Sequence, residues 1–305
     1  MINIVARRYL YFLISALVIV PGLIGLIVWG PPSAGIDFTG GSLLEIRFED
    51  GRRPAPGQVV TLAEAVGVNG PLVQTAGETD LVVRSKPFSE DQRQELLTSL
   101  EAMAGTVTLL RDEHVGPSVG AEVARRAVGA VALAVLGILS YITYAFRGVP
   151  HATRYGVAAI LAMLHDVLVV ISIQVLVAHF FGWEIDSLFL TALLTVIGFS
   201  VHDTIVVFDR IRENQRLYRR LPYETMVNHS IVQTLARSFN TQLTVMLTLM
   251  ALLLFGGVTM QHFVTILLVG VLSGTYSSIF NAAQILVVWE NREWRTWFRP
   301  RRAAA

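Results

Sequence analysis

The sequence contains no cysteine, and Lys86 is its only lysine against 23 arginines. Without cysteine the chain forms no disulfide and no thiolate metal site. It also lacks a G-x-x-x-x-G-K-[ST] phosphate loop and an H-E-x-x-H pattern, which argues against a P-loop ATPase and a zincin-type protease. The net charge of +1 gives no overall field that would attract nucleic acid. We therefore expect no enzyme, metal or cofactor, and an energy supply from an ion gradient or a partner.

Apolar residues make up 53% of the chain and charged residues only 15%, a composition typical of a polytopic membrane protein with some soluble mass. About 20 apolar residues in a helix cross ~30 Å of hydrocarbon. Six stretches meet this requirement or come close to it. They are residues 9–29, 123–146, 152–178, 188–208, 238–255 and 263–288. The first is too long for a signal peptide, and the fifth is short, so it either tilts little or begins before Ser238.

Residues 35–115 have a soluble character and a mixed pattern. Period-2 alternation and short β-type runs predict strands near 43–48, 72–75, 81–84 and 106–111. Helices are predicted over 56–66 and 89–103, the second with Ser89 as N-cap and Gln92 completing a capping box. The order β-α-β-β-α-β is the ferredoxin-like pattern. The fold class is therefore an α-helical membrane protein with six transmembrane helices and an inserted α+β domain.

The arginines set the orientation, because positive charge gathers on the cytoplasmic side. Both termini are then cytoplasmic. We predict an N-terminus and first helix over 1–32, an extracytoplasmic domain over 33–120, helices two to six over 121–290 with an amphipathic cytoplasmic segment over 209–237, and a basic tail over 291–305. Within that segment, residues 209–220 are a charged continuation of span four, and the apolar pattern of 221–235 suits a helix lying on the membrane surface. Arg125 and Arg126 break the charge pattern, because they lie near the outer end of span two.

Ionisable residues inside the spans are the candidate site, because a charge in hydrocarbon costs several kcal/mol. Asp203 lies in span four, and Arg237 and Thr241 share a face at the start of span five. An arginine that pairs with Asp203 in one state and leaves it in another makes a proton-handling element, although a static salt bridge has the same spacing. His165 and Asp166 form either a second relay or local hydrogen bonds. His202 is either a proton carrier or a polar packing residue.

Four ordered motifs resemble the SecF family of the SecD/SecF protein-export complex. They are GIDFTGG at 35–41, VGPSVG at 115–120, DTIVVFDRIREN at 203–214 and GTYSSIF at 274–280, and they include Gly35, Asp37, Gly40, Gly41, Asp209 and Arg210. The resemblance implies an RND-type bundle in the bacterial inner membrane. It also implies SecD, the SecYEG channel, a translocating preprotein and YajC as partners, besides membrane lipid. It maps the family's proton pathway onto Asp203, Arg237 and Thr241.

The function expected from this resemblance is a proton-motive-force-driven auxiliary subunit that promotes preprotein export. An RND-type exporter of small molecules or lipids is the alternative, although it would usually need two bundles and larger outer domains. A purely structural assembly factor is a third reading. A carboxylate–arginine site without a cage of oxygen ligands favours H⁺ over Na⁺.

Overall fold

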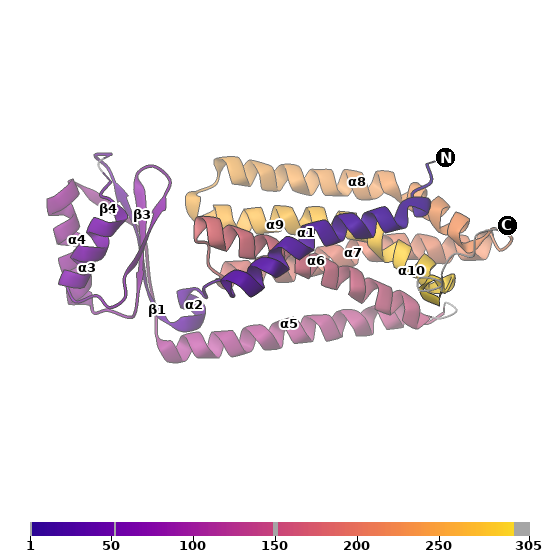
Figure 1. Ribbon diagram of the computed structural model, residues 1–305, viewed down its shortest axis with the longest axis horizontal. Helices are drawn as coiled ribbons and strands as arrows, with labels where there is room; N and C mark the ends of the chain where they lie inside the picture. The colour runs from indigo at the N-terminus through magenta and orange to yellow at the C-terminus, as the bar shows by residue number, and fades with distance from the viewer. Residues whose placement is uncertain (1, 52, 149–151, 296–305) are drawn as a thin grey trace.

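The computed structural model describes residues 2–51, 53–148 and 152–295. The described chain forms a long helical bundle with a small α/β domain at one end (Figure 1). The first and last described residues, Ile2 and Arg295, lie toward the opposite end of the bundle. These two ends of the bundle are called the domain end and the termini end below.

The small domain is a four-stranded antiparallel sheet with two helices on one face. Its elements are β1 (Gly41–Phe48), α3 (Pro56–Ala65), β2 (Leu72–Ala76), β3 (Asp80–Ser85), α4 (Glu90–Ala104) and β4 (Val107–Val115). The strand order is β2-β3-β1-β4. Alternate residues of β1, Leu44, Ile46 and Phe48, pack under α3 and α4. This arrangement confirms the predicted ferredoxin-like pattern.

Local sequence signals explain where the helices of this domain begin and end. α4 starts after Ser89, whose hydroxyl accepts from the Gln92 N–H at 3.3 Å while the Gln92 side chain accepts from the Ser89 N–H at 2.9 Å. It ends at Gly105, which has a φ of 89° that favours glycine. α3 begins with Pro56, whose missing N–H costs nothing in the first turn.

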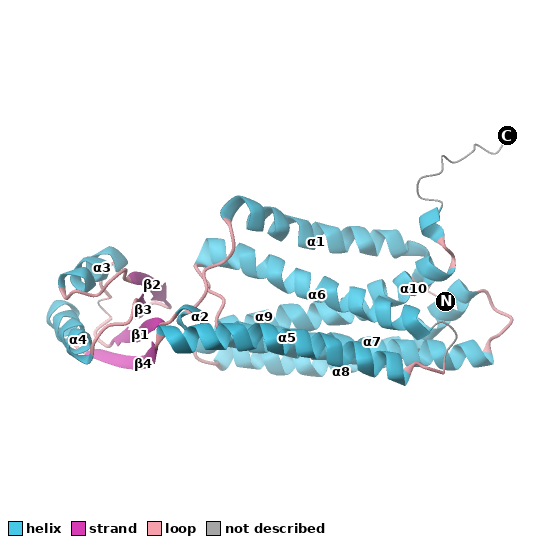
Figure 2. Cartoon of the chain, turned by 90° about the horizontal axis from the view of Figure 1, so that it is seen from below, coloured by secondary structure: helices cyan, strands magenta, loops and turns pink. Residues whose placement is uncertain are grey.

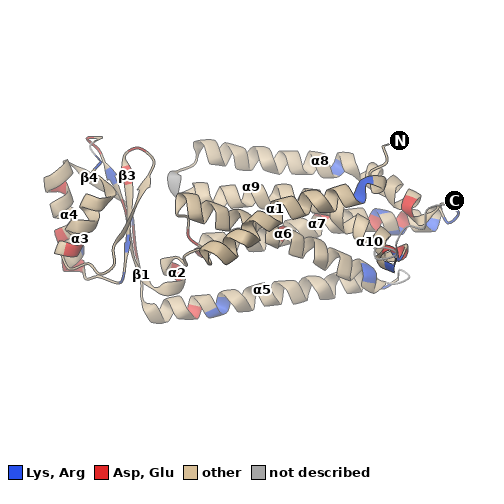
Figure 3. Ribbon diagram, in the orientation of Figure 1, with Lys and Arg blue, Asp and Glu red and all other residues tan. Residues whose placement is uncertain are grey.

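Six helical spans in the described residues are long and apolar enough to cross a membrane. Five are α1 (Arg8–Trp29), α5 (Pro117–Ala145), α6 (Ala152–Phe181), α7 (Ser187–Leu217) and α8 (Tyr223–Phe255). The sixth consists of α9 (Val258–Ser277), a π-helical turn over Ser278–Ala282 and α10 (Ala283–Glu290). Figure 2 shows these helices running along the long axis of the molecule. Charged residues gather at the termini end and on the small domain, with few in the middle of the bundle (Figure 3).

The expected surface helix over 221–235 is wrong. α7 continues to Leu217, and α8 runs without a break from Tyr223 to Phe255. Three apolar residues that suggested a surface helix, Met226, Val227 and Ile231, are buried in the bundle core. A stripe at helical spacing can face either lipid or other helices, and here it faces helices. The fifth span therefore begins before Ser238, which was one of the two alternatives for its short length.

Close packing of α7 against α9 depends on small residues. A Cβ added to Gly270 would lie 2.0 Å from Cγ2 of Val196, and one added to Gly274 would lie 3.2 Å from Cα of Ser200. Small residues let helix backbones approach in a membrane. This approach brings polar side chains of the two helices into contact.

Candidate functional site

Asp203 lies in α7 and is 5% exposed. Its helix turns the carboxylate inward together with Ser200 and Thr204, which are also buried. No hydrogen bond or ion pair within the described ranges involves Asp203. A buried carboxylate in a membrane span that makes no hydrogen bond or ion pair with any described residue is costly while charged. It therefore needs a proton or an outside partner.

Arg237 and Thr241 lie on the outward face of α8, where both are exposed. They share this face with Asn240 and Thr244, which are exposed as well. Ser238 and Gln242, on the opposite side of the same helix, are buried. The described residues contain no ion pair between Asp203 and Arg237. The chain by itself thus holds Asp203 inside the bundle and places Arg237 on its surface. The predicted Asp203–Arg237 pair remains a prediction.

Asp166 in α6 is fully buried and joins three helices. Its Oδ2 accepts hydrogen bonds from the Ser200 hydroxyl of α7 at 2.5 Å and the Ser277 hydroxyl of α9 at 2.6 Å. Its Oδ1 accepts from the Ser273 hydroxyl of α9 at 2.6 Å and faces Nδ1 of His165 at 3.0 Å. These hydroxyls are almost completely buried. The cluster of Asp166, His165, Ser200, Ser273 and Ser277 is called the Asp166 centre below.

The structure gives the two candidate histidines different surroundings. His165 belongs to the Asp166 centre, whereas His202 is exposed on α7 and makes no hydrogen bond within the described chain. Sequence reasoning missed Ser200 as a member of the centre. Its place one turn before Asp203 on the same inward face was a signal that could have found it.

The charged motif that follows Asp203 fastens the termini end of α7. Asp209 pairs with Arg212, and Arg210 pairs with Glu213 at 2.6 Å and donates to the Gln233 side chain of α8 at 2.6 Å. Asn214 is fully buried and donates to the hydroxyl of Ser230 at 2.8 Å. Arg210 therefore helps to hold α7 against α8, whereas the Asp209–Arg212 pair lies within α7.

The glycine-rich motif at 35–41 joins the small domain to the bundle. It includes the short helix α2 (Ile36–Thr39), which packs on the start of α5. The Gly35 N–H donates to the Ile185 carbonyl at 2.8 Å, and Asp37 accepts from the Ser187 N–H at 2.8 Å. Ser187 is the first residue of α7, so Asp37 caps that helix at its positive end. Gly41 starts β1 with a φ of 146°.

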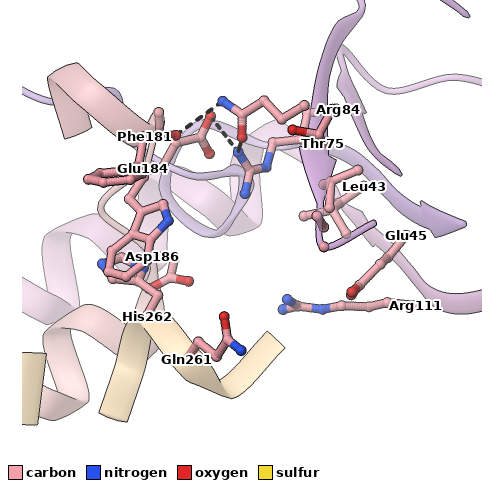
Figure 4. A pocket seen from close by; sticks show the side chains of 16 residues that line it. Leu43, Glu45, Thr75, Arg84, Arg111, Phe181, Glu184, Asp186, Gln261 and His262 are labelled. Carbon is pink, nitrogen blue, oxygen red and sulfur yellow. Dashed lines mark hydrogen bonds and ion pairs between the residues drawn. The ribbon is translucent and has the colours of Figure 1, made fainter. Parts of the chain in front are cut away.

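A polar cavity of about 400 Å³ lies between the open face of the sheet and the domain end of the bundle (Figure 4). Arg84 of β3 pairs across it with Glu184, in the loop between α6 and α7, at 3.1 Å. Beside them the Gln74 side chain donates to the Gly182 carbonyl at 3.1 Å. Burial raises the pKa of Glu184, and the Arg84 charge opposes this. The cavity side chains therefore fasten the sheet to the same loop that Gly35 and Asp37 hold.

The residues that the structure describes contain no cluster of three or more His, Cys, Asp or Glu side chains placed to hold a metal ion. The chemistry that the arrangement can support is proton binding by isolated buried carboxylates, with hydroxyls and an imidazole as neighbours.

Residues 95–292 match the family described as "Protein export membrane protein SecD/SecF, C-terminal", and residues 35–51 match the SecD/SecF GG motif. The chain is 54% identical over 301 residues to the protein translocase subunit SecF of Anaerolinea thermophila, covering 98% of this chain and 97% of the relative. This chain belongs to the SecF family of protein translocase subunits.

Two further SecF-family comparisons concern longer proteins. Protein translocase subunit SecDF of Bacillus subtilis is 33% identical over 94% of this chain, which covers 38% of that relative. The crystal structure of SecDF from Thermus thermophilus, a translocon-associated membrane protein, superposes with a TM-score of 0.83 at 35% identity. The match covers 95% of this chain and 39% of the SecDF chain. The six-helix bundle with its sheet domain thus has the fold of about two fifths of a SecDF chain.

Proposed function

We propose that this chain is a proton-motive-force-driven auxiliary subunit of the Sec protein translocase, which acts with SecD to promote export of preproteins. The family supports a role in the translocase, and the SecDF proteins, of which this chain matches about two fifths, support the partnership with SecD. The Asp203 site supports the coupling to protons. SecYEG, YajC and the preprotein are the further partners in this proposal.

The observation that carries the coupling is the separation of Asp203 from Arg237. Asp203 makes no hydrogen bond or ion pair within the described residues, and Arg237 with Thr241 lies on the surface of α8. A SecD bundle packed on α8 would cover that surface and exclude lipid from it. Asp203 would then alternate between a protonated form and a form that is charged and paired. If Asp203 and Arg237 formed a static salt bridge within one chain, the two side chains would already be in contact.

The orientation in the proposal follows the distribution of charge. Arginines of the loops and ends gather at the termini end of the bundle, whereas the loop 182–186 at the domain end carries none (Figure 3). By the positive-inside rule the termini are cytoplasmic and the small domain is outside the inner membrane. The cavity and the sheet would then face the side on which an exported preprotein emerges.

The test is gradient-dependent export by vesicles that contain this chain, SecD and SecYEG. We expect Asp203→Asn to abolish the stimulation by a proton gradient while assembly with SecD is retained. Glu122→Gln, which removes an exposed carboxylate of α5, is the matched control and should leave stimulation unchanged. Full stimulation by Asp203→Asn would overturn the proton coupling. Full export by the double variant Asp203→Asn, Arg237→Gln would support the structural role instead.

A further inference from the structure

The Asp166 centre contains a carboxylate that has no arginine or lysine partner among the described residues. Asp166 is 0% exposed, and the described residues place no arginine or lysine in contact with it. The only basic side chain next to it in the described chain is His165, whose Nδ1 lies 3.0 Å from Oδ1. An uncompensated charge this deep in a membrane span is expensive, and such groups tend to neutralise. One proton on the His165–Asp166 pair gives that neutral form.

The position of the proton follows from the other imidazole nitrogen. Nε2 of His165 is buried and has no hydrogen-bond partner among the residues described. If the proton made His165 an imidazolium, Nε2–H would be a charged donor without an acceptor. If the proton is on Asp166, Nε2 is only a neutral acceptor without a donor, which costs less. The occupied form therefore has a neutral His165, with its hydrogen on Nδ1, and a protonated Asp166.

We propose that Asp166 is a second proton-binding site of the bundle, separate from Asp203, and that it holds its proton on Oδ2. The Ser277 hydroxyl makes this form possible, because the Gly274 carbonyl oxygen at 3.2 Å is a second acceptor for it. On protonation an O–H bond forms at Oδ2 and donates to the Ser277 oxygen, while Ser277 turns its own hydrogen to Gly274. A hydronium ion supplies the proton and is left as water, water takes the proton back on release, and no electrons are transferred.

Ser273 and Ser277 differ in a way that tests this account. Both are buried and donate to Asp166 at 2.6 Å, from positions four residues apart on one helix face. No second acceptor for Ser273 is found in the described part of the chain, so it stabilises the charged carboxylate. Ser277 serves the charged form as a donor and the protonated form as an acceptor. Ser273 therefore biases the site against the proton, and Ser277 does not.

Other titratable groups around the centre are few. α7 carries His202 and Asp203, two and three residues after Ser200. α9 carries Tyr276, whose ring centroid lies 6.1 Å from that of His165 and whose hydroxyl donates to the Tyr11 carbonyl of α1 at 2.7 Å. None of these groups contacts the Asp166 carboxylate within the described residues. Titration of the centre should therefore report Asp166 itself.

The experiment is infrared difference spectroscopy of the full chain in lipid vesicles, recorded from about pH 5 to about pH 9. We expect a C=O band of a protonated carboxylic acid that titrates, that disappears in Asp166→Asn and that remains in Asp203→Asn. Ser273→Ala should raise the midpoint by about one pH unit, a tenfold gain in proton affinity, because a hydrogen bond to the charged form is lost. Ser277→Ala should shift the midpoint by less than half as much.

Two outcomes would overturn the proposal. One is that no titrating band depends on Asp166. The other is that Ser277→Ala shifts the midpoint as much as Ser273→Ala does, which would mean that both serines are plain donors to a fixed charge. A role for this proton in transport rests on the proposed function, but the titration does not. Failure here and failure of the Asp203 export test are therefore distinguishable.

Discussion

Replacing Gly40 by alanine should loosen the junction between the small domain and the bundle. Gly40 has φ 74° and ψ 158°, a region of backbone conformation that is essentially restricted to glycine, and forcing another residue into it costs about 1–3 kcal/mol. The added Cβ would also lie 2.7 Å from Cα of Pro117, and such overpacking costs about 1–3 kcal/mol. Even a total of about 2 kcal/mol raises the population of the open junction roughly 30-fold.

Amide hydrogen exchange measures this opening directly. The N–H groups of Gly35, Ile185 and Ser187 are hydrogen-bonded across the junction, so their exchange should accelerate at least about 30-fold in Gly40→Ala. Exchange at Ile46 in the core of the sheet should change much less if the domain itself remains folded. Gly57→Ala is the control, because its Cβ meets open space in helix α3 and alanine favours a helix. Unchanged exchange at the three junction amides would refute the reasoning.

Two further substitutions test separate contacts. Gly270→Ala should destabilise the bundle by about 1–3 kcal/mol, because its Cβ would meet Val196 at 2.0 Å. Thermal unfolding in detergent should show a lower midpoint for this variant, whereas Gly198→Ala, whose Cβ meets open space, should show little change. Equal unfolding midpoints for the two variants would contradict this prediction. Arg47 donates to both oxygens of Asp80 and lowers the pKa of that carboxyl below its ordinary 3.8. The pair therefore contributes stability above pH 3.8 that is lost as the pH falls through the lowered pKa. Arg47→Ala should destabilise the small domain at neutral pH and flatten this acid dependence in hydrogen exchange, and an unaltered pH profile would count against the pairing.

The sequence was sufficient for features that depend on local pattern. Six spans follow from length and apolar composition, and the capping box at Ser89 and Gln92 places the start of α4. The sequence was not sufficient to predict which neighbour a given helix face contacts. Spacing puts Arg237 and Thr241 on one face of α8, but whether that face turns toward Asp203 depends on how α8 packs. The error over 221–235 has the same origin, because a buried helix and a surface helix share one period.

The Asp166 centre was beyond sequence reasoning for a different reason. Ser200, Ser273 and Ser277 are 34, 107 and 111 residues from Asp166. Single serines in apolar helices carry no signal of which carboxylate they will meet. Only the close approach of α7 and α9 at Gly274 brings them to it.

The contacts at the loop 182–186 connect the small domain mechanically to α7. Asp37, at the base of the small domain, binds the N–H of Ser187, the first residue of this helix. Asp203 follows 16 residues after Ser187, about 24 Å along the same helix. Energetic coupling between two places on a molecule works equally in both directions. If protonation of Asp203 rotates α7 and moves the small domain, then a force applied to that domain by a cargo must in turn change the proton affinity of Asp203.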